Sequence, residues 1–162
     1  MKACFFLTYT IAVRDQIYNE SGRVSTIGIS VTDPAWVERI MVRGKMLFII
    51  EGLSMYLTSE ENKQMLSIIH GNFDNAIVLM ECLAKKWVNK ENVEESIQKT
   101  GAKFVFGADS FDDIKDIAIG FRRVKDDNII RGMITIYPIL SVFSWVPYIK
   151  KITQKILVFE KI

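Results

Sequence analysis

Short apolar runs of strand length, separated by polar and turn-forming residues, dominate the pattern of this chain. The clearest run is Met46–Ile50, which is continuously apolar and is followed directly by Glu51 and Gly52. A continuous apolar run of this length is typical of a strand buried on both faces of a parallel sheet. The pattern therefore predicts a buried strand that ends on the carboxylate of Glu51.

A helix and a second buried strand are predicted directly after this turn. Thr58 and Glu61 have the spacing of a capping box, in which the two residues satisfy each other's backbone N–H groups at the start of a helix. The apolar face of this helix comes from Met65, Leu66 and Ile69, and Gly71-Asn72 ends it. The next apolar run, 75–82, predicts another buried strand that ends near Glu81.

The remaining segments continue the alternation of strands and helices. We expect strands at 3–13, 23–31, 121–125 and 155–160, and helices at 33–42, 90–99 and 109–117, with a helix-like apolar segment at 135–149. Asp33 is the expected N-cap of its helix, with Pro34 in the first turn and Gly44 after the end. The pattern predicts an α/β layer fold with a largely parallel sheet, and one domain over 1–162.

Composition restricts the classes of function. The chain has 162 residues, of which 49% are hydrophobic and 25% charged, as expected for one folded domain rather than a disordered segment. A net charge of +2 with scattered basic residues does not favour nucleic acid. Cys4 and Cys82 lie in apolar runs and are predicted to be buried, reduced thiols. With one histidine and no paired ligand spacing, no metal site is expected.

The N-terminal segment allows two interpretations. Lys2 followed by the apolar run 3–13 is similar to the core of a signal peptide, but no small-x-small cleavage site follows the run. The run is also too short to span a bilayer. We therefore favour a buried strand, a cytoplasmic protein and no membrane partner.

Two carboxylates are the leading candidates for ligand contacts. Glu51 falls at the carboxyl end of a predicted parallel strand, where ligands bind in open α/β sheets. It could accept hydrogen bonds from ammonium or hydroxyl groups of a ligand, or be solvated or paired with a lysine. Glu81 repeats this position one strand later.

Four other side chains have structural explanations that compete with functional ones. Asp33 is already explained as a helix cap, and Trp36 could stack on a planar ligand but has the spacing of a core residue. Tyr56 could cover a pocket or pack on the next helix. His70 lies near a helix C-terminus, where the helix dipole favours its charged form. No Ser-His-Asp arrangement, P-loop or GxGxxG motif is present in the sequence.

Two stretches carry a resemblance to a known family. Asp33-Pro34-Ala35-Trp36, and the element from Leu47 through Glu51-Gly52-Leu53-Ser54-Met55-Tyr56 to Leu57, resemble the leucine carboxyl methyltransferase family, in particular its bacterial branch of tetracenomycin-type polyketide O-methyltransferases. The stretches 101–107 and 144–149 fit the same branch in the same order. The resemblance extends from about residue 11 onward.

The resemblance implies an S-adenosylmethionine-dependent O-methyltransferase with a Rossmann-like sheet, whose substrate is a carboxylate of a small molecule or peptide. It implies that Glu51 contacts the methionine end of the cofactor, and that Ser30, Val31 and Asp33 lie near the adenine. A carboxylate is already a nucleophile at neutral pH, so methyl transfer needs no general base. The rate then comes mainly from alignment and exclusion of water.

The chain also departs from the family pattern. The family's first strand with its glycine-rich cofactor turn has no counterpart here, residues 5–8 do not supply the expected ribose-binding acid, and Val31 stands where related branches carry an aspartate. We therefore expect the C-terminal portion of a methyltransferase, which would be unable to bind cofactor alone. The alternatives are an enzyme whose N-terminal strand takes the vacant place, or an inactive interaction module or pseudoenzyme.

Self-association is a further expectation. In the family's sheet the first strand lies between the second and the fourth, so its absence would leave two strands with exposed apolar edges. The expected outcome is a homo-oligomer.

Overall fold

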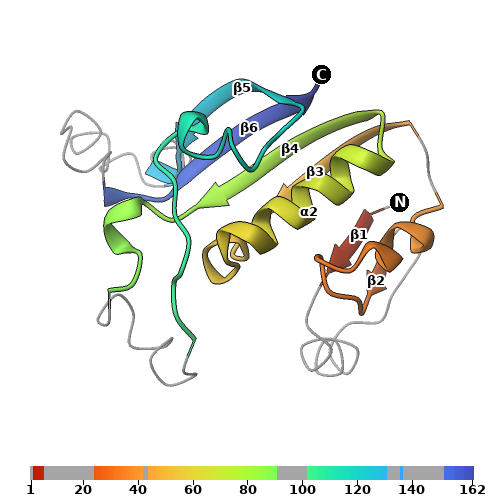
Figure 1. Ribbon diagram of the computed structural model, residues 1–162, viewed down its shortest axis with the longest axis horizontal. Helices are drawn as coiled ribbons and strands as arrows, with labels where there is room; N and C mark the ends of the chain where they lie inside the picture. The colour runs from red at the N-terminus through yellow and green to blue at the C-terminus, as the bar shows by residue number, and fades with distance from the viewer. Residues whose placement is uncertain (1, 6–23, 42–43, 91–101, 131–135, 137–151) are drawn as a thin grey trace.

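The computed structural model describes residues 2–5, 24–41, 44–90, 102–130, 136 and 152–162 (Figure 1). Its elements, in chain order and with 3₁₀ helices labelled η, are β1 (Lys2–Phe5), β2 (Val24–Ile27), η1 (Pro34–Arg39), β3 (Lys45–Ile50), η2 (Ser54–Tyr56), α2 (Ser59–Asn72), β4 (Asn75–Cys82), η3 (Lys85–Trp87), η4 (Phe111–Asp113), β5 (Phe121–Asn128) and β6 (Lys155–Lys161).

The main sheet has four strands in the order β3-β4-β6-β5. β3 and β4 are parallel and joined by α2, whereas β6 runs antiparallel to both of its neighbours. β1 and β2 form a separate parallel pair. The predicted α/β character is confirmed, but the expectation of a largely parallel sheet is wrong for the four-stranded sheet. The reason is that β6 lies between β4 and β5 and runs antiparallel to both.

The core lies between the sheet and α2, which crosses in front of β3 and β4 in Figure 1. Met65, Leu66 and Ile69, the predicted apolar face of the helix, are all buried. They belong to one hydrophobic cluster with strand residues such as Val78 and Phe159. Burial of these side chains is the main favourable contribution to this layer.

The N-terminus of α2 has the predicted capping box. The Glu61 backbone N–H donates to Thr58 Oγ1 at 3.2 Å, and the Thr58 N–H donates to Glu61 Oε2 at 2.8 Å. The Glu61 carboxylate accepts hydrogen bonds from the Thr58 N–H and from the Thr58 hydroxyl, and both favour its charged form, so the pKa of Glu61 lies below its usual value. The cap fixes the start of the helix at Ser59, seven residues after Gly52.

The expectation that the run Met46–Ile50 is buried on both faces is wrong. Ile50 is buried on the α2 side, but Leu47 and Ile49 are 59% and 61% exposed on the opposite face. Successive strand residues point to opposite faces, and α2 covers only one of them. In the described part of the sheet β3 is an edge strand, so it also lacks a neighbour on one side.

The segment predicted as a helix at 33–42 forms the shorter η1. Its cap is confirmed: the Asp33 side chain accepts a hydrogen bond from the Ala35 N–H at 2.9 Å, with Pro34 in the first turn. The predicted strand at 23–31 is observed as the shorter β2, whose pairing with β1 ends at Ile27.

The later elements differ from the predicted ones mainly in length. The predicted helix at 109–117 is reduced to η4, which follows Ser110, and β5 continues three residues past the predicted end. The predicted strands 75–82 and 155–160 are confirmed as β4 and β6. The strand portion 6–13, the helix 91–99 and most of the segment 135–149 lie outside the described residues.

Cys82 is a free, buried thiol, as predicted. Desolvation raises its pKa to about 12, and a hydrogen bond with Ser54 opposes the rise. The side chain of Cys4 is outside the described set. None of the helices that the structure describes is long and apolar enough to cross a membrane.

Candidate functional site

The two candidate carboxylates meet at one edge of the sheet. β3 and β4 are parallel and Ile50 pairs with Met80, so Glu51 and Glu81 occupy matching positions at the carboxyl ends of neighbouring strands. Their environments differ: Glu51 is exposed, whereas Glu81 is 9% exposed. Only Glu51 therefore offers its carboxylate to a ligand at the surface.

The buried carboxylate holds the turn that presents the exposed one. The Gly52 backbone N–H donates to Glu81 Oε2 at 2.8 Å. Gly52 has φ +62°, a left-handed conformation that glycine adopts without the penalty of a Cβ. Glu81 thus fixes the direction of the chain immediately after Glu51.

Two buried polar side chains continue this network into α2. Ser54 donates from Oγ to the Glu81 carbonyl oxygen. Asn62 donates from Nδ2 to the carbonyls of Ser54, Leu57 and Thr58 at 3.0, 3.1 and 3.0 Å. Ser54 and Asn62 are both fully buried. Asn62 supplies a partner for the Leu57 carbonyl and adds a second donor to the Ser54 and Thr58 carbonyls, which also accept from the Leu57 and Asn62 backbone N–H groups.

Sequence reasoning missed Ser54 and Asn62. A signal was present for Asn62, because it precedes Leu66 by four positions and so lies on the apolar face of the helix. A polar residue at such a position has to find hydrogen-bond partners inside the protein. For Ser54 the sequence carries no comparable signal.

The other predicted cofactor contacts follow β2. The Val31 carbonyl accepts a hydrogen bond from Trp36 Nε1 at 3.0 Å, and Ser30 Oγ lies 2.8 Å from Thr32 Oγ1. Gln64 Nε2 on α2 donates to the Thr32 carbonyl at 2.8 Å. The first turns of α2 therefore hold both this segment and the turn after β3. Within the described part of the chain, Glu51 forms no hydrogen bond or ion pair with Ser30, Val31 or Asp33.

The aromatic candidates have structural roles. Trp36 is 2% exposed and stacks on Phe73 with ring centroids 5.9 Å apart, which confirms the core interpretation. Tyr56 packs beside Phe104 at 5.3 Å. The ring of His70 meets Phe121 edge-on at 5.4 Å.

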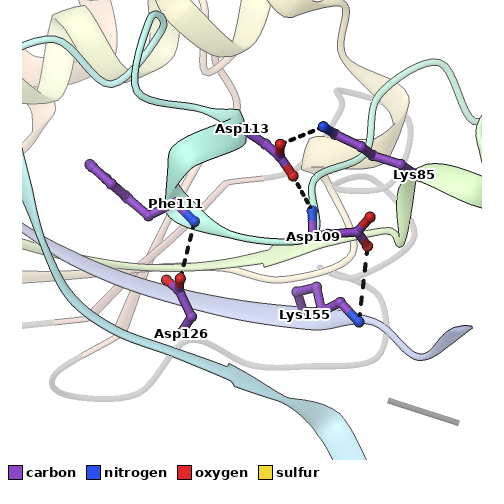
Figure 2. A network of polar contacts seen from close by, with 6 residues as sticks. All are labelled: Lys85, Asp109, Phe111, Asp113, Asp126 and Lys155. Carbon is purple, nitrogen blue, oxygen red and sulfur yellow. Dashed lines mark hydrogen bonds and ion pairs between the residues drawn. The ribbon is translucent and has the colours of Figure 1, made fainter. Parts of the chain in front are cut away.

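A second polar cluster lies at the same end of β4 (Figure 2). Lys155 pairs with Cys82 in the sheet, and its Nζ is 4.0 Å from Asp109 Oδ1. Desolvation lowers the pKa of Lys155, and the charge of Asp109 opposes this shift. The Asp109 N–H donates to Asp113 Oδ2 at 2.8 Å, and Lys85 forms an ion pair with the other oxygen of Asp113.

Asp126 connects this cluster to β5. Its Oδ2 accepts a hydrogen bond from the Phe111 N–H at 3.3 Å and lies 3.6 Å from Arg123 Nη1 (Figure 2 draws the former). These contacts join the loop after β4 to the far strand of the sheet. The charges are spread along the sequence, so their spacing did not reveal the cluster. The described residues contain no group of three or more side chains arranged to hold a metal ion.

The two glutamates are expected to differ in their effect on stability. Glu81→Ala should lower the free energy of unfolding by about 1–3 kcal/mol, because it leaves the Gly52 N–H without its acceptor in a partly buried site. Glu51→Ala, the matched surface control, should change it by no more than about 0.5 kcal/mol. Urea denaturation followed by circular dichroism measures both. Equal effects of the two substitutions would contradict the assigned role of Glu81.

Comparison with known proteins gives one informative similarity. No protein-family model matches the chain. Over 97 residues the chain is 25% identical to the tetracenomycin polyketide synthesis O-methyltransferase TcmP of Streptomyces glaucescens. The match covers 60% of this chain and 36% of that protein, so the chain spans little more than a third of this relative's length. The similarity supports a distant relationship to O-methyltransferases.

Proposed function

We propose that this chain is an S-adenosylmethionine-dependent O-methyltransferase-like protein of the leucine carboxyl methyltransferase family, with a Rossmann-like sheet. The observation that carries the proposal is the exposed Glu51 at the carboxyl end of parallel β3, on a turn fixed by Glu81. The similarity to an O-methyltransferase supports the same reaction class. In this view β1 and β2 correspond to the second and third strands of the family's sheet, and β3 to the fourth.

The residues fit one end of the cofactor better than the other. The exposed carboxylate of Glu51 suits the ammonium group of the methionine end, to which it can accept a charge-assisted hydrogen bond. At the adenine end, the Val31 carbonyl and the Asp33 side chain already accept hydrogen bonds from Trp36 and Ala35. We therefore propose that the chain carries half of a cofactor site and binds the cofactor weakly on its own.

The cofactor, when bound, supplies an activated methyl group on a sulfonium. A carboxylate on a small molecule or peptide is the proposed acceptor, and such a group needs no general base at neutral pH. The protein then has to orient the two reactants and exclude water. The fixed turn after β3 contributes by holding Glu51 in one place relative to the sheet.

An NMR titration with S-adenosylhomocysteine tests the proposal at the site. The Gly52 amide signal is expected to shift with a Kd near about 1 mM, the range of weak small-ligand binding. Glu51→Gln should weaken binding by at least about tenfold, because it removes a charge-assisted hydrogen bond. Glu60→Gln, an exposed carboxylate on the first turn of α2, is the matched control and should bind as the unaltered protein does.

A second candidate function is an inactive interaction module. The observation that favours it is the exposure of Leu47 and Ile49 on β3, an edge strand among the strands that the structure describes, because edge strands readily pair with other chains. A folded protein whose spectrum does not change on addition of S-adenosylhomocysteine would contradict the methyltransferase proposal and favour this alternative.

A further inference from the structure

Glu81 carries a buried charge that the turn after β3 does not fully use. Its side chain is nine-tenths buried, and its Oε2 accepts the hydrogen bond from the Gly52 N–H. Within the described part of the chain, its other oxygen, Oε1, has no hydrogen-bond donor, and the carboxylate has no ion-pair partner. Carboxylates are rarely buried to this extent without a cation beside them. One backbone amide is enough to fix the turn, so the charge itself needs a different explanation.

Two lysines near the end of β4 face aspartates instead of Glu81 (Figure 2). Lys85 forms its ion pair with Asp113, and Lys155 Nζ lies 4.0 Å from Asp109 Oδ1. Lys155 is paired in the sheet with the residue that follows Glu81. Because successive strand residues point to opposite faces, the side chains of Lys155 and Glu81 lie on opposite sides of the sheet. Neither lysine therefore compensates the charge of Glu81.

The charge of Glu81 acts on the groups around it. Burial is the main cause of the raised pKa of Cys82, a hydrogen bond with Ser54 opposes the rise, and the negative charge of Glu81 adds to it. Glu51 occupies the matching position on β3, and neighbouring strands lie about 4.8 Å apart. The turn therefore brings two carboxylates side by side, where like charges repel each other. Within the described residues neither carboxylate has an ion-pair partner.

We propose that the turn after β3 is a site for a positively charged group, and that Glu81 is a positioning residue that makes the site selective for such a group. An ammonium group of the ligand contacts Glu51, and the buried charge of Glu81 attracts it from the neighbouring strand. The bound cation then relieves the repulsion between the two carboxylates. This inference deepens the proposed function and rests on it only in assigning the ammonium group to the methionine end of the cofactor.

A charge-reversal cycle tests the site without any ligand. Glu51→Lys places an ammonium group at the turn and replaces repulsion by attraction, which should raise Tm by about 2–4 °C. In protein that already carries Glu81→Gln, the same substitution should raise Tm by less than about 1 °C, because the buried charge is gone. Glu81→Gln keeps an oxygen that can accept from the Gly52 N–H, so the turn stays in place. Glu38→Lys, an equal change of net charge at an exposed position on η1, is the matched control and should have the same effect with or without Glu81→Gln.

A pair of ligands tests the selectivity. S-adenosylhomocysteine carries an ammonium group, and its deaminated analogue differs only in lacking that group. NMR titrations that follow the Gly52 amide give the Kd of each ligand. Glu81→Gln should reduce the preference for S-adenosylhomocysteine over the analogue by about three- to tenfold, because it removes a nearby opposite charge. A role for Glu81 in the turn alone would change the binding of both ligands equally and leave the preference as it is.

The outcomes distinguish this inference from the proposed function. Equal effects of Glu51→Lys with and without Glu81→Gln would overturn the inference, whatever the ligands do. Coupling in the cycle without binding of S-adenosylhomocysteine would contradict the proposed function and support the inference, with the ammonium group belonging to another ligand. An unchanged ligand preference in Glu81→Gln would overturn the selectivity assigned to Glu81. If circular dichroism shows that Glu81→Gln is unfolded, Glu51→Lys still decides, because a Tm no higher than that of Glu51→Ala would overturn the inference.

Discussion

Phe159→Ala is expected to lower the free energy of unfolding by about 3–5 kcal/mol, the range for truncation of a buried phenylalanine. Phe159 is fully buried in β6, opposite Val78 of β4. Its ring centroid lies 5.4 Å from that of Phe111 and 5.3 Å from that of Phe121. The substitution removes both aromatic contacts and leaves a cavity between the sheet and the residues that cover it. Guanidinium chloride denaturation measures the loss.

The neighbouring residue is the matched control. Val158 is half-buried on the opposite face of the same strand, so Val158→Ala should cost only about 0.5–1.5 kcal/mol. The ratio between the two effects reports which face of β6 belongs to the core. Similar losses for both substitutions would contradict the one-sided burial of the sheet.

Gly120→Ala is expected to cost about 2–3 kcal/mol, from a backbone penalty and a steric one together. Gly120 has φ +81°, which disfavours any residue with a Cβ. An added Cβ would also lie 2.2 Å from His70 Nε2, closer than van der Waals contact allows. The imidazole then has to move and lose its edge-on contact with Phe121. Thermal and urea denaturation give the change in stability.

Two further variants separate the penalties. Gly71→Ala is the matched control, because nothing lies within 4 Å of an added Cβ and the residue is within α2, where alanine is favoured by up to about 1 kcal/mol. In a double-mutant cycle with His70→Ala, the steric part of the Gly120→Ala effect should vanish and the backbone part remain. Strict additivity of the two substitutions would contradict the clash.

Elements with strong local signals could be predicted from the sequence. The capping box of Thr58 and Glu61 and the bounds of β4 follow from residues that are close together in the chain. The position of β6 could not be predicted, because an apolar alternation does not say which strands it will join. The exposure of Leu47 was missed for a related reason: whether a face of a strand is covered depends on segments elsewhere in the fold.

The exposed residue of the candidate site could be predicted from the sequence, but the buried residues that hold its turn in place could not. The position of Glu51 at a strand end followed from the boundary between an apolar run and a glycine. The different roles of Glu51 and Glu81 could not be predicted, because both residues end apolar runs in the sequence and only tertiary packing buries Glu81. The buried amide of Asn62 likewise finds its partners only once η2 folds back onto α2.

The place of β6 between β4 and β5 has a consequence for folding during synthesis. β6 follows both β4 and β5 in the sequence. During synthesis, neither strand can therefore pair with β6 until the chain as far as Lys161 has been made. During that interval β4 presents a bare edge and its apolar residues Val78 and Met80 lack a complete cover. Nascent chains are most vulnerable to aggregation in such states. Pairing of β6, rather than formation of the β3-α2-β4 unit, is therefore the step that covers the edge of β4.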